Sequence, residues 1–75
     1  MQVRKQLDIS KVSNPYEKDI LSFLNANGKC IYGEIIKELK ISATKGQEAI
    51  YSLIHKGHIK QANKTSYIEL NVELR

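Results

Sequence analysis

Residues 42–59 read SATKGQEAIYSLIHKGHI, a pattern typical of one amphipathic helix. At about 100° per residue, the side chains divide between two faces. The apolar face holds Ala49, Ile50, Leu53 and Ile54, and the polar face holds Thr44, Glu48, Tyr51 and His55, with Gln47 at its edge. Gly46 inside the helix costs about 1 kcal/mol relative to alanine, so we expect another element to pack closely there. This helix is expected to face a core on one side and a partner on the other.

Tyr51 does not fit the polar face on which it falls. It is a large aromatic side chain one turn after Gln47, in a segment bounded by Lys45 and Lys56. An aromatic ring left in water exposes apolar area without a folding gain, which is typical of a contact residue. The alternative is a half-buried tyrosine that lies against the neighbouring strand. The sequence leaves both interpretations open.

The chain before this stretch predicts a first helix and an N-terminal tail. Ser13, Asn14 and Pro15 form a helix start signal, with either Asn14 or Ser13 as the cap and with Glu17 placed to reach back to the first free N–H groups. Residues 25–28 end this helix. Residues 1–12 show no clean period, so we expect a tail there, anchored by Leu7, Ile9 and Val12 and followed by one domain over residues 13–75.

The remaining elements complete a recognisable order. Residues 29–32 predict a short strand and residues 34–40 a second helix, and Ser42 is placed to cap the third helix. Ile59 begins a strand whose hairpin partner is residues 67–72. The order helix, strand, helix, helix, hairpin predicts an α+β fold. The expected architecture is a winged helix-turn-helix, with three helices packed on a small antiparallel sheet and a C-terminal β-hairpin as the wing.

Length and composition indicate one small domain. The chain has 75 residues, of which 41% are hydrophobic and 27% are charged, and no apolar run approaches the ~20 residues of a membrane span. The opening stretch MQVRKQLDIS lacks the apolar core of a signal peptide. Cys30 is the single cysteine, which suits a reducing compartment. We therefore expect a protein of the cytoplasm or nucleus without a membrane partner.

The positive charge is concentrated on the third helix and the segment after it. The net charge is +4, and residues 42–64 hold four lysines against one acid, Glu48. This surface suits a polyanion, because each neutralised phosphate releases condensed counterions. Mildly basic small domains are also common without any such role. Charge therefore favours nucleic acid without establishing it.

Catalytic chemistry is poorly supported by the residues. No paired-carboxylate site, activated nucleophile or glycine-rich phosphate loop is recognisable as a motif. His55, His58 and Cys30 match no standard metal-site spacing, so we expect two imidazoles that face solvent or cap the helix end. The prediction is a binding domain, not an enzyme, without a metal or other cofactor and without a small-molecule substrate.

Two modes of nucleic-acid binding compete. A helix that reads base edges in a major groove needs several Arg, Asn or Gln side chains along its exposed face. The third helix offers Gln47 alone, with Glu48 beside it to repel phosphate. The other mode reads the path of the backbone with lysines, hydroxyls and one aromatic ring, and selects conformation instead of sequence. The residues favour this second mode.

The segment KGQEAIYSLIHKGHI, residues 45–59, resembles the third helix of the Zα family, winged helix-turn-helix domains that bind left-handed Z-DNA and Z-RNA. The likeness lies in a tyrosine four residues after a carboxamide and in the closing pattern Y-S-L-x-x-K-G, within a weaker likeness over about residues 15–70. In its high content of lysine and isoleucine, the chain is most similar to the N-terminal domain of the poxvirus interferon-resistance protein, in particular to that of a yatapoxvirus.

The resemblance implies a role for individual residues. Tyr51 matches the tyrosine that packs on a syn purine, and Gln47 stands where the family has asparagine. In the wing, Thr65 matches a threonine, Ser66 replaces a proline and Glu69 replaces a tryptophan that braces the tyrosine. Because of these replacements, we expect weaker binding than in the strongest family members. The predicted site comprises Thr44, Lys45, Gln47, Tyr51, Lys60, Lys64, Thr65 and Ser66.

The same resemblance implies partners and setting. The implied partner is left-handed double-stranded DNA or RNA, with two domains on each short duplex. The implied setting is a viral protein that contains this domain and counters host interferon responses. The location is the host cytoplasm or nucleus. Two rivals stay open: a sequence-specific regulator that binds right-handed B-DNA through the same fold, and a winged helix that serves only as a protein-interaction module.

Overall fold

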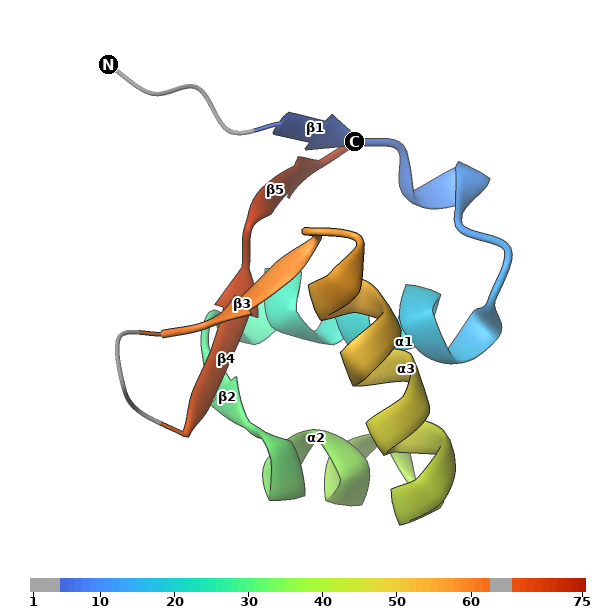
Figure 1. The fold of residues 1–75 in the computed structure, drawn as a ribbon, viewed down its shortest axis with the longest axis vertical. Coiled ribbons are helices and arrows are strands. Elements are labelled where there is room, and N and C mark those ends of the chain that lie inside the picture. The colour runs from blue at the N-terminus through green and yellow to red at the C-terminus, as the bar shows by residue number, and fades with distance from the viewer. Residues whose placement is uncertain (1–4, 63–65) are drawn as a thin grey trace.

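The computed structural model describes residues 5–62 and 66–75. Its helices are α1 (Pro15–Asn27), α2 (Tyr32–Leu39) and α3 (Ala43–His55), and its strands are β1 (Lys5–Leu7), β2 (Cys30–Ile31), β3 (Ile59–Gln61), β4 (Tyr67–Leu70) and β5 (Val72–Leu74). A short 3-10 helix, η1 (Ile9–Lys11), follows β1. Figure 1 shows the three helices gathered on one side of the sheet that contains β2, β3 and β4. The winged helix-turn-helix prediction is confirmed.

The first helix begins as its start signal predicts. Asn14 Oδ1 accepts hydrogen bonds from the backbone N–H groups of Tyr16, at 2.8 Å, and Glu17, at 3.3 Å. Pro15 occupies the first helical position, where its missing N–H costs nothing. At the other end, Gly28 adopts a φ of 77°, which only glycine reaches without strain. The Asn14 cap and the Gly28 stop are confirmed.

Glu17 has a different role from the predicted one. Its carboxylate does not cap α1 but accepts a hydrogen bond of 2.9 Å from Lys56 Nζ. Glu17 is 4% exposed, and a buried carboxylate needs a charged partner more than a helix start needs a second cap. This ion pair joins the start of α1 to the end of α3.

The turn between α2 and α3 places the two helices in close contact. Ser42 Oγ accepts from the Lys45 N–H at 3.2 Å, so the predicted cap of α3 is confirmed. A Cβ added at Gly46 would collide with the side chain of Ile36 on α2 and would lie 3.3 Å from Cδ1 of Ile41. The expected close packing at Gly46 is therefore confirmed.

The wing is an antiparallel hairpin, although the predicted partner strand is divided. β4 pairs with β3 in the register Ile59↔Leu70 and with β2 through Cys30↔Ile68. The chain then bends at Asn71, whose N–H donates to the His58 carbonyl at 2.9 Å. Val72, expected in the same strand, instead begins β5. The alternation of residues 67–72 did not indicate this bend.

The described part of residues 1–12, where we expected a tail, contains a short strand and the 3-10 helix η1. β1 pairs in parallel with β5, and the Arg75 N–H donates to the Leu7 carbonyl at 3.0 Å. Figure 1 shows these two segments side by side, away from the wing. A three-residue strand is too short to show a hydrophobic period in the sequence, and the strand that pairs with β1 lies about 67 residues further along the chain. The sequence therefore did not indicate β1. The predicted anchors do pack against the core: Leu7, Ile9 and Val12.

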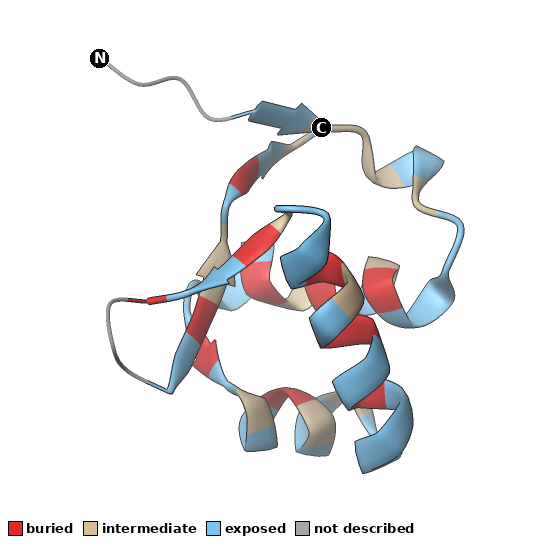
Figure 2. Cartoon of the chain, viewed as in Figure 1, coloured by how far each residue is buried: buried red, intermediate tan, exposed pale blue. Residues whose placement is uncertain are grey.

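The core lies between the helices and the inner face of the sheet. Figure 2 shows the buried residues concentrated where α1, α3 and the strands face one another. The buried apolar side chains include Ile20, Leu21, Leu24, Ile35, Leu53 and Ile59. Of the predicted apolar face of α3, Ile54 alone remains 39% exposed. Within the described residues, no helix combines the length and apolar character that crossing a membrane requires.

Candidate nucleic-acid interface

Tyr51 projects from the solvent side of α3. Its relative exposure is 62%, the highest among the exposed large hydrophobic residues of the described part of the chain. The interpretation of a half-buried tyrosine against the strand is therefore wrong. Gln47, one turn earlier, donates a hydrogen bond from Nε2 to Tyr51 Oη at 3.3 Å. The two side chains that the resemblance assigns to base and phosphate contact thus lie together and point outward.

A hollow of about 340 Å³ lies beside Tyr51, between α3 and the sheet. Its lining comprises Tyr32, Gln47, Ile50, Tyr51, Ile54, Gln61 and Ile68. Tyr32, Ile54 and Gln61 were not among the predicted site residues. Ile54 was assigned to the core, and only its place at the edge of the apolar face, next to Tyr51, could have indicated its exposure.

The predicted alignment of the wing requires a correction. Glu69, assigned to the position that braces the tyrosine, does not line the hollow beside Tyr51, whereas Ile68 does. Successive side chains of a strand point to opposite faces. Ile68 therefore faces inward with 5% exposure, and Glu69 turns outward to pair with Lys60 at 3.7 Å. On the side of the sheet, the apolar side chain of Ile68 therefore lines the hollow beside Tyr51.

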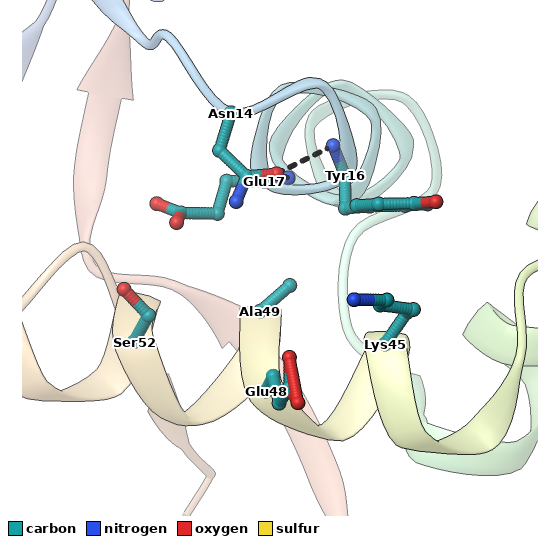
Figure 3. Close-up of a pocket in the computed structure, with 7 residues that line it drawn as sticks. All are labelled: Asn14, Tyr16, Glu17, Lys45, Glu48, Ala49 and Ser52. Atoms are coloured by element: carbon teal, nitrogen blue, oxygen red, sulfur yellow. Dashed lines mark hydrogen bonds between the residues drawn. The ribbon is translucent and has the colours of Figure 1, made fainter.

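Lys45 lies at the other edge of the exposed surface of α3. Figure 3 shows its side chain extending from α3 toward the first turn of α1. There it lines a separate hollow of about 290 Å³ with Asn14, Tyr16, Glu17, Glu48, Ala49 and Ser52. The structure therefore does not bring Lys45 into contact with Gln47 and Tyr51. By helical position, the exposed Thr44 and Glu48 lie on the arc between them, so a ligand that covers this arc would meet both edges.

The wing residues are only partly described. Lys60 is exposed on β3, where its ion pair with Glu69 offsets its charge. An exposed pair of this kind is worth about 0–1 kcal/mol, so Lys60 can exchange Glu69 for a phosphate at small cost. Ser66 is exposed immediately before β4. The predicted contacts of Lys64 and Thr65 lie outside the described residues.

The metal-ligand combination considered from the sequence does not form. No group of three or more His, Cys, Asp or Glu side chains suited to a metal lies within the described residues. Cys30 is buried, and burial raises the pKa of its thiol, which disfavours the thiolate that metals bind. Burial also lowers the pKa of His58, whose Nδ1 has no hydrogen-bond partner within the part of the chain described.

One solved structure relates this geometry to a known domain. Comparison with family models and with curated proteins gave no match. The structure is similar to the crystal structure of the Zalpha domain from Carassius auratus PKZ in complex with Z-DNA, with a TM-score of 0.66 and 27% sequence identity over 73% of this chain and 90% of that chain. This similarity supports a place in the Zα family and matches the Zα winged-helix fold. It does not indicate a poxvirus relative.

Proposed function

We propose that this domain binds left-handed double-stranded nucleic acid and selects its conformation instead of its base sequence. The observation that carries the proposal is the outward presentation of Tyr51 beside Gln47 on α3. The similarity to a Zα domain that was crystallised with Z-DNA supports it. No core requirement explains a tyrosine that is 62% exposed, so its ring is available to a ligand.

Tyr51 supplies the discrimination in this proposal. In the left-handed duplex, alternate purines adopt the syn conformation and expose a base surface that the right-handed duplex does not present. The Tyr51 ring packs against such a base, and aromatic packing on a base contributes about 1–3 kcal/mol. Gln47 holds the Tyr51 hydroxyl and retains an amide oxygen, which can bind a water on the phosphate backbone. Charge alone would not distinguish the two duplexes.

The basic side chains supply a smaller and less selective part of the affinity. Lys45 lies at one edge of α3, and Lys60 lies on β3 with Ser66 beside the neighbouring strand. Contacts of these groups with phosphates release counterions and make binding salt-dependent. Glu48 on the same arc and Glu69 beside Lys60 limit this attraction. Weak binding to right-handed duplexes follows.

The effect on the nucleic acid is a population shift. The left-handed form is a minor conformer in ordinary salt, because its phosphates approach one another more closely. A ligand moves such an equilibrium only by its differential affinity for the two forms. In this proposal the contact with Tyr51 provides that difference, and the domain needs no catalytic group.

The biological setting is also a proposal. We place the domain in a viral protein that sequesters left-handed nucleic acid from host interferon sensing, in the host cytoplasm or nucleus, with two domains on each short duplex. Sedimentation of the domain with a short alternating CG duplex tests the stoichiometry, and a 1:1 complex would overturn that part. Expression in interferon-treated cells tests the role, since sensing of left-handed RNA should fall with the wild type and not with Tyr51→Ala.

Competition between duplexes tests the main proposal. Fluorescence anisotropy measures the affinity for an alternating CG duplex held left-handed by base bromination, and for a random right-handed duplex of equal length. We expect tighter binding to the left-handed duplex at every salt concentration. Equal affinity for both would contradict conformational selection, and preference for one right-handed sequence would favour a B-DNA regulator. No salt-dependent binding to either duplex would favour a protein-interaction module.

A further inference from the structure

We infer that Tyr32 is a positioning residue for the proposed site, which fixes α3 so that Gln47 and Tyr51 meet the ligand together. The inference rests on the proposed function and assigns a role to a residue outside the predicted contact set. Tyr32 is the first residue of α2 and is half-buried. It lies on a different element from both contact residues and reaches α3 through its hydroxyl group.

The first part of the argument is a hydrogen bond between the two helices. Tyr32 Oη donates to the Ala43 carbonyl at 2.7 Å, a short bond across 11 residues of sequence. Ala43 is the first residue of α3, and Ala43, Gln47 and Tyr51 follow one another at intervals of four along one stripe of that helix. The Tyr32 hydroxyl therefore holds the start of the stripe that carries both contact residues.

The second part is the position of the Tyr32 ring. The ring lines the hollow beside Tyr51, together with Gln47 and Ile50. Tyr32 thus contacts the backbone of Ala43 at the start of the stripe and lies beside the side chains of Gln47 and Tyr51. The hydroxyl contact holds the first residue of the stripe, and the Gln47–Tyr51 hydrogen bond joins its next two residues.

A separate contact between α2 and α3 explains why the hydroxyl is needed. Gly46 lies directly against Ile36, which fixes how closely the two helices approach. The rest of α3 is held by its packing against α1 and β3 and by the Lys56–Glu17 ion pair at its C-terminal end. The hydrogen bond from Tyr32 to Ala43 adds a contact at the first residue of α3, where the stripe that carries Gln47 and Tyr51 begins, and so restricts the direction in which these side chains project. Its loss should disturb the site more than the fold.

Tyr32→Phe tests the inference, because it removes the hydroxyl and keeps the ring. Asn71→Ala is the control, since Asn71 also donates a side-chain hydrogen bond to a distant backbone carbonyl, that of Gly57 at 3.1 Å, and lines neither hollow beside α3. A net hydrogen bond contributes about 0.5–1.5 kcal/mol. We therefore expect Tyr32→Phe to weaken binding to the brominated left-handed duplex about three- to tenfold, with unchanged binding to the random right-handed duplex.

Spectra of the free protein separate this inference from the proposed function. NMR of the ligand-free domain should show shifted Gln47 side-chain amide and Tyr51 ring signals in Tyr32→Phe but not in Asn71→Ala. Unmoved signals, or wild-type affinity for the left-handed duplex, would overturn the positioning role. An equal loss of affinity for both duplexes together with a large fall in the unfolding temperature would overturn it in favour of a purely structural role. If the wild type itself does not prefer the left-handed duplex, the proposed function fails, and the role of Tyr32 in binding fails with it, whatever the spectra show.

Discussion

Tyr51 carries little of the folding energy and most of the proposed selectivity. Its ring is largely exposed, and substitutions at exposed positions usually change stability by less than about 0.5 kcal/mol. We expect Tyr51→Ala to unfold at nearly the wild-type temperature and to lose the preference for left-handed duplex in the anisotropy competition. Tyr51→Phe should keep most of that preference, because it retains the ring and loses only the contact with Gln47.

Ile31→Ala is the control for the ring deletion, because it removes an exposed large apolar side chain from β2, outside both hollows beside α3. It should bind the left-handed duplex like the wild type. Retention of the full preference by Tyr51→Ala would remove Tyr51 from the site.

Lys45 lies apart from Tyr51, so we expect it to contribute to the affinity for both duplexes and not to the selection of conformation. A lysine that contacts one phosphate affects binding mainly through counterion release. We expect Lys45→Ala to weaken binding to both duplexes and to reduce the slope of log affinity against log salt by about one. Lys37→Ala, which removes an exposed lysine from α2, should leave the slope unchanged. Equal slopes for the wild type and Lys45→Ala would place Lys45 outside the interface.

The close contact of Gly46 with α2 helps to position the binding helix, which also packs against α1 and β3. A methyl group added at Gly46 meets Ile36 and Ile41, whereas one added at Gly33 meets nothing within 4 Å. Overpacking of this kind costs about 1–3 kcal/mol, partly offset by the better helix propensity of alanine. We expect Gly46→Ala to lower the free energy of unfolding in urea and Gly33→Ala to raise it.

The double substitution of Gly46 and Ile36 by alanine tests the cause of that loss. It should show a favourable coupling energy, since removal of the Ile36 side-chain end makes room for the new methyl group. A Gly46→Ala protein as stable as Gly33→Ala would show that α3 does not depend on this close approach.

Local signals predicted the helices well because each start and stop depends on neighbouring residues. Asn14 and Ser42 accept hydrogen bonds from N–H groups two or three positions away, and Gly28 ends α1 through its own backbone angle. Such features are readable without knowledge of the fold. Helical periodicity also placed Tyr51 on the polar face of α3, but it left exposure and half-burial against the strand both open, and only the structure decides for exposure.

The features that sequence reasoning missed depend on partners that are distant in the chain. Glu17 meets Lys56 across 39 residues, and Tyr32 donates to Ala43 across a turn whose geometry no local signal specifies. The alignment placed Glu69 where the family has its bracing tryptophan, but Ile68 and not Glu69 lines the hollow beside Tyr51, because successive residues of a strand point to opposite faces. This hollow depends on the tertiary arrangement, which brings Tyr32, Tyr51 and Ile68 together.

The stability of the whole domain should depend on pH through His58. Burial lowers the pKa of its imidazole, Lys56 and Lys5 lower it further, and Glu17 acts in the opposite direction. The unfolded chain therefore takes up this proton first as the pH falls below about 6.5. The stabilisation is present above that pH and is lost as the pH falls toward the lower pKa of the folded state.

We therefore expect urea unfolding to show a smaller free energy of unfolding at about pH 5.5 than at about pH 7.5. His58→Gln should reduce the difference, whereas His55→Gln, which removes the exposed imidazole at the end of α3, should retain it. An undiminished difference in His58→Gln would assign the pH dependence to another group.

A circular dichroism titration of an alternating d(CG) duplex in moderate salt tests the central claim most directly. The duplex starts right-handed, so the measurement reports whether the domain can shift the population. We expect the wild-type domain to invert the spectrum of the d(CG) duplex and to leave that of a random right-handed duplex unchanged. A d(CG) spectrum that stays right-handed at saturating domain would contradict the account.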